Sequence, residues 1–306
     1  MAFVTRFAPS PTGPLHLGHA YSAMLAHDMA QAGGGTFVLR IEDIDRSRCR
    51  PEWENQLIDD LNWLGIFWDT EPLRQSDRVG MYSQSLDKLW ADGLIYPCNC
   101  SRRDIEAALS APQEGTELPA GPDGLIYPGV CRNKNHQRTV SERTSRPADA
   151  NLRLNVSRVT VDESFERRFD ISTGGWQWFA SYRETGIGPL GNSGLIEFSP
   201  EDIETQVGDF VIARRDMGTS YHLSVVLDDA AQRITHVVRG ADLTEATKIH
   251  VLLQRLLGLP TPIYHHHRLI RDENGKRLAK RDDARALSKY RAEGATPADI
   301  RRMVGL

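Results

Sequence analysis

A short segment rich in Pro, Ser, Thr and Gly constrains the fold of this chain more than any other. It reads FAPSPTGPLHLGH over residues 7–19, between the strand-like residues 2–7 and residues 15–32, whose apolar side chains recur at helical spacing. A strand, a tight loop and a helix in this order predict a βαβ unit and hence a parallel sheet. The first turn of such a helix favours a phosphate, because it carries unpaired N–H groups and the positive end of the helix dipole.

Two histidines in this segment predict where a nucleotide binds. His16 and His19 are three residues apart and share one face of the helix, and Gly18 lets a flat ring approach the backbone. Two surface histidines after an ordinary loop would show the same spacing. The strand before them and the helix after them favour the nucleotide site, with both histidines on a phosphate chain.

Periodic patterns along the rest of the chain predict an α/β fold. The expected helices are 51–64, 77–91 with Ser76 as its cap, and 245–257; the expected strands are 36–41, 210–213, 223–227, 234–239 and 264–270. Residues 97–199 are irregular and rich in Gly, Pro and Asn, with short runs such as NLRLNV at 151–156. A turn at 272–275, a basic loop at 276–281 and two short helices within 284–306 complete the expected order.

These patterns predict a Rossmann-type parallel sheet with an irregular, zinc-containing insertion and a small helical C-terminal segment. Four segments are expected: the first half of the nucleotide-binding fold (1–96), the insertion (97–205), the second half (206–260), and the basic loop with a helical segment that contacts a stem (261–306).

Three cysteines suggest the zinc site in the insertion. Cys98, Cys100 and Cys131 would supply three thiolates, and zinc prefers four N or S ligands. Judged from the residues alone, His136 is the first choice for the fourth ligand. Three unliganded thiols are the alternative, but an irregular insertion needs some cross-link to stay ordered.

Three charged residues at predicted strand ends suggest an amino-acid site. Arg6, Glu42 and Arg239 lie at or just past the carboxyl ends of strands, where ligands of such sheets bind. Two guanidinium groups and one carboxylate complement a ligand with two carboxylates and one ammonium group, and glutamate is such a ligand. A surface salt bridge is the alternative role for Arg239.

Composition excludes several classes of protein. The 306 residues contain no apolar run long enough to span a membrane and no signal-peptide pattern, and the four cysteines are unevenly spaced. We therefore expect a cytoplasmic protein in a reducing compartment. The net charge is −4, but residues 262–306 carry 11 Lys and Arg against six Asp and Glu, net +5, which leaves −9 elsewhere. A basic end could contact a polyanion, or it could be a solvated charged surface.

Several blocks, in order, resemble the class I aminoacyl-tRNA synthetases, and more narrowly their glutamyl and glutaminyl branch. They are residues 6–19, RIED at 40–43, GDFVIARRD at 208–216, ITHVVRGADL at 234–243 and KRLAKR at 276–281. The last block differs from the family's Lys-Met-Ser-Lys-Ser signature, since Arg277, Ala279 and Arg281 replace its first lysine and two serines. Lys280 matches the lysine that contacts ATP.

The resemblance implies activation of glutamate by ATP with Mg²⁺, and it implies roles for individual residues. Glutamate would contact Arg6, Phe7, Ala8, Pro9, Ser10, Glu42, Tyr221 and Arg239; ATP would contact His16, Gly18, His19 and Lys280, with His16, His19 and Lys280 catalytic. The family's metal pattern maps onto Cys98, Cys100, Tyr127 and Cys131, so it favours Tyr127 over His136 as the fourth ligand.

The length of the chain suggests the acceptor. Only 25 residues follow Arg281, too few for an anticodon-binding region of ordinary size, so the chain resembles the short paralogues of glutamyl-tRNA synthetase. This resemblance implies activation without tRNA and transfer of glutamate to the wobble queuosine of tRNA(Asp). A monomer without a membrane partner is expected. The alternatives are a minimal glutamyl-tRNA synthetase that charges a 3′ end, a nucleotidyltransferase acting on a small metabolite, and a non-catalytic tRNA-binding paralogue.

Overall fold

The structure is a computed structural model that describes residues 2–110, 118–135, 145–159, 164–170, 174–271 and 285–306. The predicted turn at 272–275, the loop at 276–281 with Lys280, and the alternative zinc ligand His136 lie outside these residues. Within them, no helix combines the length and apolar character that crossing a membrane requires.

The first half of the fold is the predicted βαβ unit. Strands β1 (Val4–Phe7), β2 (Thr36–Ile41) and β3 (Leu73–Arg74) form a parallel sheet in the order β1-β2-β3. Helix α1 (Leu17–Ala32) connects β1 to β2. Helix α2 (Pro51–Trp63) has proline at its first position, where the missing N–H costs nothing, so both predicted helices are confirmed.

A second sheet contains the later strands. Its order is β10 (Gly194–Phe198), β9 (Gly175–Glu184), β13 (Ile263–His267) and β12 (His236–Gly240). Strand β13 is parallel to both β9 and β12, whereas β10 and the outlying β8 (Glu166–Asp170) pair with β9 in antiparallel fashion. Helix α9 (Thr247–Leu257) connects β12 to β13 and ends at Gly258 in the left-handed conformation, as the sequence predicts.

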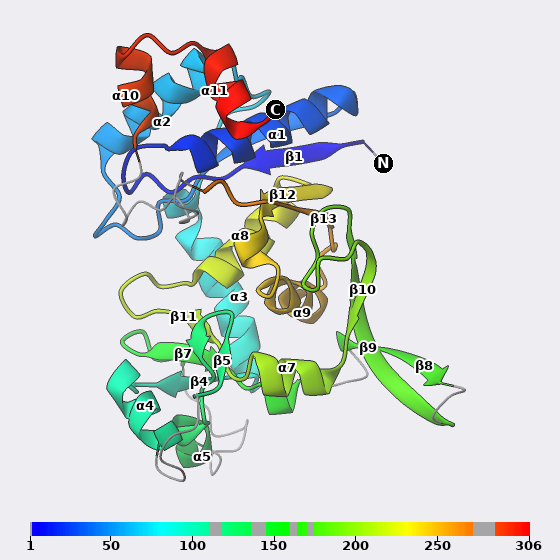
Figure 1. Cartoon of the computed structure of the whole chain (residues 1–306). Helices are drawn as coiled ribbons and strands as arrows, with labels where there is room; N and C mark the ends of the chain where they lie inside the picture. The colour runs from blue at the N-terminus through cyan, green and yellow to red at the C-terminus, as the bar shows by residue number, and fades with distance from the viewer. Residues whose placement is uncertain (1, 111–117, 136–144, 160–163, 171–173, 272–284) are drawn as a thin grey trace.

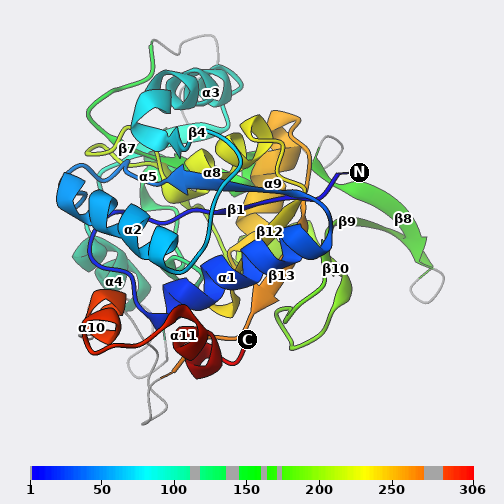
Figure 2. The same cartoon turned by 90° about the horizontal axis from the view of Figure 1, so that it is seen from above.

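The two sheets meet where β1 lies beside β12. Thr235 N donates to Val4 O at 2.9 Å, and Val4 N donates to the Thr235 hydroxyl at 2.8 Å. The Arg6 side chain then reaches Val238 O, so the two strands run in the same direction. The carboxyl ends of β1, β2 and β12 consequently lie at one edge (Figure 1). Helices α1, α10 and α11 lie on one side of β1 and β12, and α3, α8 and α9 lie on the other (Figure 2).

The prediction of a strand at 223–227 is wrong, because these residues lie in helix α8 (Tyr221–Ala231). Ser220 caps the helix by accepting from Leu223 N. Most side chains of α8 are buried, so the segment shows a continuous apolar run rather than a helical stripe. Such a run cannot be assigned to a strand or a buried helix by periodicity alone.

The prediction that residues 97–199 are irregular is also wrong. This part contains α4 (Arg102–Ser110), the hairpin β5 (Ala120–Gly121) and β6 (Gly124–Leu125), α5 (Val130–Asn135), β7 (Asn151–Leu154), the 3-10 turn Val156–Arg158, and β8 to β10. The aromatic-rich β9 carries a strand signal that the surrounding glycines obscure. Since β9 pairs with β13, the main sheet includes residues assigned to the insertion; the four-segment division stays a prediction.

Two smaller expectations also fail. The predicted strand 210–213 corresponds to β11 (Val211–Ala213), which lies outside the main sheet in a three-stranded sheet of order β11-β7-β4, with β4 at Ile95–Cys98. The predicted helix 77–91 is a 3-10 turn (Gln75–Arg78) followed by α3 (Val79–Ala91), and Ser76 is not its cap. Ser76 donates instead to the Asp43 carboxylate through its backbone N–H at 2.8 Å and its hydroxyl at 2.7 Å.

The C-terminal residues form the two predicted short helices, α10 (Leu287–Ala292) and α11 (Pro297–Val304). Thr296 caps α11 in a reciprocal capping box with Asp299. Arg301 of α11 pairs with Asp28 of α1 at 2.6 Å, and Leu287 N donates to Leu15 O at 2.8 Å. These contacts bring the end of the chain back to the start of α1. The remaining elements are α7 (Pro200–Gln206) and the 3-10 turn Ala241–Leu243.

Candidate active site

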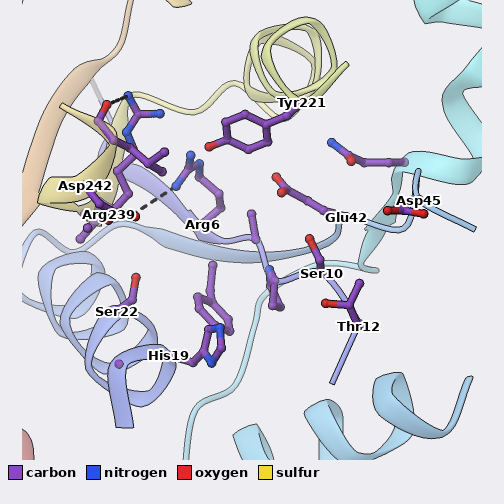
Figure 3. Close-up of a pocket in the computed structure, with 18 of the residues that line it drawn as sticks. Arg6, Ser10, Thr12, His19, Ser22, Glu42, Asp45, Tyr221, Arg239 and Asp242 are labelled. Carbon is purple, nitrogen blue, oxygen red and sulfur yellow. Dashed lines mark hydrogen bonds between the residues drawn. The ribbon is translucent and has the colours of Figure 1, made fainter. Parts of the chain in front are cut away.

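A cavity of about 670 Å³ lies at the carboxyl ends of β1, β2 and β12, beside the first residues of α1 and α8 (Figure 3). All the described residues predicted to contact glutamate or ATP line this cavity: Arg6, Phe7, Ala8, Pro9, Ser10, His16, Gly18, His19, Glu42, Tyr221 and Arg239. The structure therefore brings together side chains that are more than 230 positions apart in the sequence.

Arg6 is buried but only partly satisfied by the protein. Its Nε donates to Asp229 Oδ1 at 3.0 Å, and Nη1 donates to Val238 O at 3.3 Å. Within the described residues, three of its five N–H groups have no protein acceptor. These remaining donors can bind an anionic ligand in the cavity.

Arg239 is the second buried guanidinium, and its described partners are all neutral. Nε donates to His266 Nε2 at 3.0 Å and Nη1 to His250 Nδ1 at 2.9 Å, while Nη2 donates to Thr247 Oγ1 at 2.8 Å and to Leu243 O at 3.3 Å. Burial and the charge of Arg239 lower the pKa of His250 well below its usual value, so this histidine is neutral. A buried cation with no ion pair among the described residues favours a ligand carboxylate nearby.

Glu42 supplies a buried negative charge at the same cavity. Its Oε1 accepts from Arg40 at 3.3 and 3.4 Å, and the side chain extends toward Arg6 and Tyr221 (Figure 3). Burial raises the pKa of Glu42, although Arg40 and Arg6 oppose this shift. Arg40 also donates to Asp229 at 2.6 Å. Asp229 is buried as well, but Arg6 and Arg40 outweigh desolvation and lower its pKa.

Among these buried residues, Arg6 and Arg40 balance the charges of Asp229 and Glu42. Arg239 has no ion-pair partner among the described residues. Neither Arg40 nor Asp229 was predicted from the sequence to lie at the site. Arg40 stood in one of the family-like blocks, but nothing local indicated its partner 189 positions later.

His16 and His19 form a cap at the start of α1. His16 is the residue before the helix, and not part of its first turn as predicted. Its Nδ1 accepts from Gly18 N at 3.1 Å, while His19 Nδ1 accepts from His16 N at 3.2 Å. Both rings therefore carry their proton on Nε2 when neutral, which makes each Nε2 a donor suited to a phosphate oxygen. A Cβ on Gly18 would lie 3.0 Å from His16 Cε1, so glycine keeps this cap uncrowded.

Tyr221 is the first residue of α8, and its hydroxyl points across the cavity toward Arg6 (Figure 3). Burial raises its pKa, so the phenol stays protonated and can donate a hydrogen bond. Ser220 fixes the start of the helix and hence the direction of this side chain.

The three predicted cysteine ligands also come together, away from the cavity. The Sγ atoms of Cys98, Cys100 and Cys131 lie within 4.8 Å of one another, and Tyr127 Oη is 3.4 Å from Cys100 Sγ. A tetrahedral zinc with bonds of about 2.3 Å places its sulfurs about 3.8 Å apart, so the cluster could hold a metal. Burial raises the pKa of Cys100 to about 11. Burial also acts on Cys131, but hydrogen bonds from Tyr127, the Asn99 backbone and the other two cysteines together outweigh it and lower that pKa to about 7.

Comparison with known proteins places this arrangement in context. A family model described as tRNA synthetases class I (E and Q), catalytic domain, matches residues 2–162 and 193–306. A Glutamyl-Q tRNA(Asp) synthetase of Rhodobacter capsulatus is 61% identical over 303 residues, covering 99% of this chain and 100% of the relative. A protein of the same name from Albidiferax ferrireducens is 40% identical over 285 residues, covering 93% and 86%.

Solved structures share the fold. A glutamate tRNA ligase from Elizabethkingia meningosepticum, crystallised with its amino acid, superposes with a TM-score of 0.68 at 23% identity. The match covers all of this chain but 61% of the ligase, so this chain spans less than two thirds of that protein. Residues 163–192, which contain β8 and β9, are not matched by the family model.

Proposed function

Because the chain belongs to the glutamate and glutamine branch of the class I tRNA synthetases, a family of ligases, we propose that it activates glutamate with ATP and transfers it to the queuosine of tRNA(Asp). The charge pattern of the cavity supports glutamate as the amino-acid substrate. Arg6 and Arg239 offer cationic donors to two carboxylates, and Glu42 offers an anion to the ammonium group. The hydroxyl of Tyr221 adds one hydrogen bond to the ligand.

The rate of the first step would depend on how glutamate and ATP are positioned, and less on proton transfer by a side chain. An oxygen of the glutamate α-carboxylate attacks the α-phosphorus of ATP, the bond from that phosphorus to the bridging oxygen breaks, and pyrophosphate leaves. Because the nucleophile is already an anion, no general base is required. Nε2 of His16 and of His19 would donate to phosphate oxygens at the start of α1, and Lys280 would neutralise the leaving pyrophosphate. Mg²⁺ accompanies ATP as its counter-ion.

The second step would transfer the glutamyl group to a hydroxyl. A hydroxyl of the queuosine cyclopentenediol attacks the adenylate carbonyl, an ester forms and AMP leaves. The relatives' names support tRNA(Asp) as the acceptor. The basic segment 262–306 would contact the anticodon stem, and its residues 285–306 include contacts to α1 and to Leu15 beside the cavity.

We also propose that Cys98, Cys100, Tyr127 and Cys131 bind one structural Zn²⁺. The ion would cross-link the end of β4 to the start of α5 and would take no part in the reaction. Arg153 Nε lies 3.3 Å from Cys98 Sγ, so its positive charge would stabilise the thiolate form that zinc requires.

A charging assay tests the proposal. The protein is incubated with ATP, labelled glutamate, and tRNA(Asp) from normal cells or from cells unable to make queuosine. We expect glutamate-dependent exchange of pyrophosphate into ATP without any tRNA, and label only on the modified tRNA. Equal labelling of both tRNAs would instead establish a minimal glutamyl-tRNA synthetase. Exchange that does not depend on glutamate would indicate a nucleotidyltransferase acting on another metabolite.

A further inference from the structure

Arg239 is the first of four side chains that hydrogen bonds connect in series, and the series ends at a second cavity. Arg239 Nη1 lies 2.9 Å from His250 Nδ1, His250 Nε2 lies 3.0 Å from His222 Nδ1, and His222 Nε2 lies 2.9 and 3.0 Å from the two carboxylate oxygens of Asp123. The four residues come from β12, α9, α8 and the turn between β5 and β6. Both histidines are buried, whereas 45% of the Asp123 side chain is exposed.

While both histidines are neutral, the N–H groups in this series of hydrogen bonds can all donate in only one direction, from Arg239 toward Asp123. A guanidinium donates and never accepts, so His250 Nδ1 must be the acceptor and His250 carries its proton on Nε2. That proton is donated to His222 Nδ1, so His222 carries its own proton on Nε2 and donates it to Asp123. The guanidinium at one end and the Asp123 carboxylate at the other thereby favour the same tautomer of both rings.

A second, shorter connection holds the other side of the guanidinium. Arg239 Nε donates to His266 Nε2, and His266 Nδ1 lies 2.5 Å from Glu184 Oε2. Both His266 and Glu184 are fully buried. Each side of Arg239 is therefore held by a histidine whose tautomer depends on a carboxylate, and among the described residues only the Asp123 connection reaches a cavity wall.

The second cavity, of about 720 Å³, lies between the cysteine cluster and the start of α8. Asp123 and His222 line it, and Tyr221 lines both cavities. The β5–β6 turn thus places a carboxylate from the cysteine-rich part of the chain against α8. Its contact with His222 connects that part to the amino-acid site.

We propose that Asp123, His222 and His250 are positioning residues that orient the guanidinium of Arg239 for its ligand. The inference rests on the proposed function in that the ligand of Arg239 is taken to be glutamate. Without the Asp123 carboxylate, Arg239 alone favours these tautomers, so the other tautomers of His222 and His250 become more populated, and a His250 with its proton on Nδ1 would face Arg239 with a donor. The glutamate site would weaken, while the ATP site at His16 and His19 would not change.

Two substitutions at Asp123 separate its hydrogen bond from its charge. Asp123→Ala removes the acceptor, whereas Asp123→Asn removes the charge but keeps an oxygen that accepts from His222. Asp216→Ala is the matched control, because Asp216 lines the same cavity and pairs with Arg214 instead of the histidines. The measurement is glutamate-dependent pyrophosphate–ATP exchange without tRNA.

We expect Asp123→Ala to raise the KM for glutamate about fivefold to tenfold, the effect of losing one hydrogen bond of ordinary net strength. The KM for ATP should stay within about twofold of the wild-type value, as should both constants of the Asn variant and of the control. An unchanged glutamate KM in Asp123→Ala overturns the proposal. So does an Asn variant or a control as impaired as Asp123→Ala, since charge alone would then account for the effect.

Nitrogen NMR of histidine-labelled protein tests this series of hydrogen bonds without relying on activity. His222→Gln and His250→Gln variants assign the two rings. In the wild type both rings should carry the proton on Nε2, and in Asp123→Ala the signals should shift toward a mixture of tautomers. A wild-type His250 protonated on Nδ1 refutes the inference. If the wild type does not activate glutamate, the proposed function fails. The NMR result still decides whether the hydrogen bonds from Arg239 to Asp123 exist.

Discussion

Substitution of Asp229 by Asn should strongly destabilise the protein, because it removes a buried negative charge beside the cavity. Asp229 is buried and accepts from Arg6 at 3.0 Å and from the fully buried Arg40 at 2.6 Å. Asn has nearly the same size, so the substitution leaves no cavity. It does place an amide group against two guanidinium donors and leaves the four-charge group with a net positive charge.

The magnitude follows from the burial of the partners. Removing one member of a buried ion pair typically costs about 3–5 kcal/mol of unfolding free energy. Glu42 still pairs with Arg40 at 3.3 Å, which places the expected loss near the lower end of that range. The folded-state pKa of Asp229 is lowered, so its contribution is complete above the unfolded pKa near 3.8 and disappears as the pH falls through the folded value. The difference between variant and wild type should thus be constant from pH 8 to 5 and shrink only below pH 4.

Urea unfolding followed by circular dichroism measures this difference. Asp216→Asn is the control, because it removes one charge from an exposed pair with Arg214, and such pairs contribute about 0–1 kcal/mol. A loss below about 1 kcal/mol in Asp229→Asn, or a loss equal to that of the control, would show that the buried charges are not coupled as described.

Three further predictions concern other parts of the molecule. Protein purified without chelator should contain zinc at close to one ion per chain, and Cys131→Ser should lose most of it; absence of zinc from the wild type rejects the site. The pKa of His250 is lowered in the folded protein, so as the pH falls below 6.5 the unfolded chain binds this proton first and the free energy of unfolding decreases. His250→Gln should reduce the pH dependence of the free energy of unfolding by up to about 1.4 kcal/mol per pH unit between pH 6.5 and 5. Urea unfolding at several pH values measures it, and an unchanged pH dependence contradicts the prediction. Gly35→Ala should cost about 1–3 kcal/mol because its Cβ would lie 2.1 Å from Phe3 O, whereas Gly80→Ala, which meets nothing within 4 Å, should be neutral or stabilising in thermal melts.

Local sequence patterns correctly predicted helix ends, because these depend on residues that are close in the sequence. Pro51 marks the start of α2, and Gly258 marks the end of α9 with the left-handed conformation that glycine adopts easily. The convergence of Arg6, Glu42 and Arg239 followed from one rule, that the carboxyl ends of parallel strands meet at one edge. That geometry is observed, while the roles of these side chains remain proposals.

Long-range contacts decided what the sequence could not predict. Residues 223–227 have the composition of a strand, yet their burial on several sides between other elements favours helix α8. Ser76 looks like a cap but binds Asp43, which the chain brings beside it only after folding. Nothing near His250 in the sequence indicates that its ring lies between Arg239 and His222.

The junction between β1 and β12 also has a mechanical consequence. The two strands share few backbone hydrogen bonds, and the contacts across the junction include the Thr235 hydroxyl and the Arg6 side chain. Arg6 and Glu42 belong to the sheet on one side of this junction, and Tyr221 and Arg239 belong to elements on the other side. A ligand held by all four would add a non-covalent cross-link to the ion pairs of Asp229 with Arg6 and Arg40, which already join the two halves across this line. Substrate binding and stiffening of the whole sheet would then be one event.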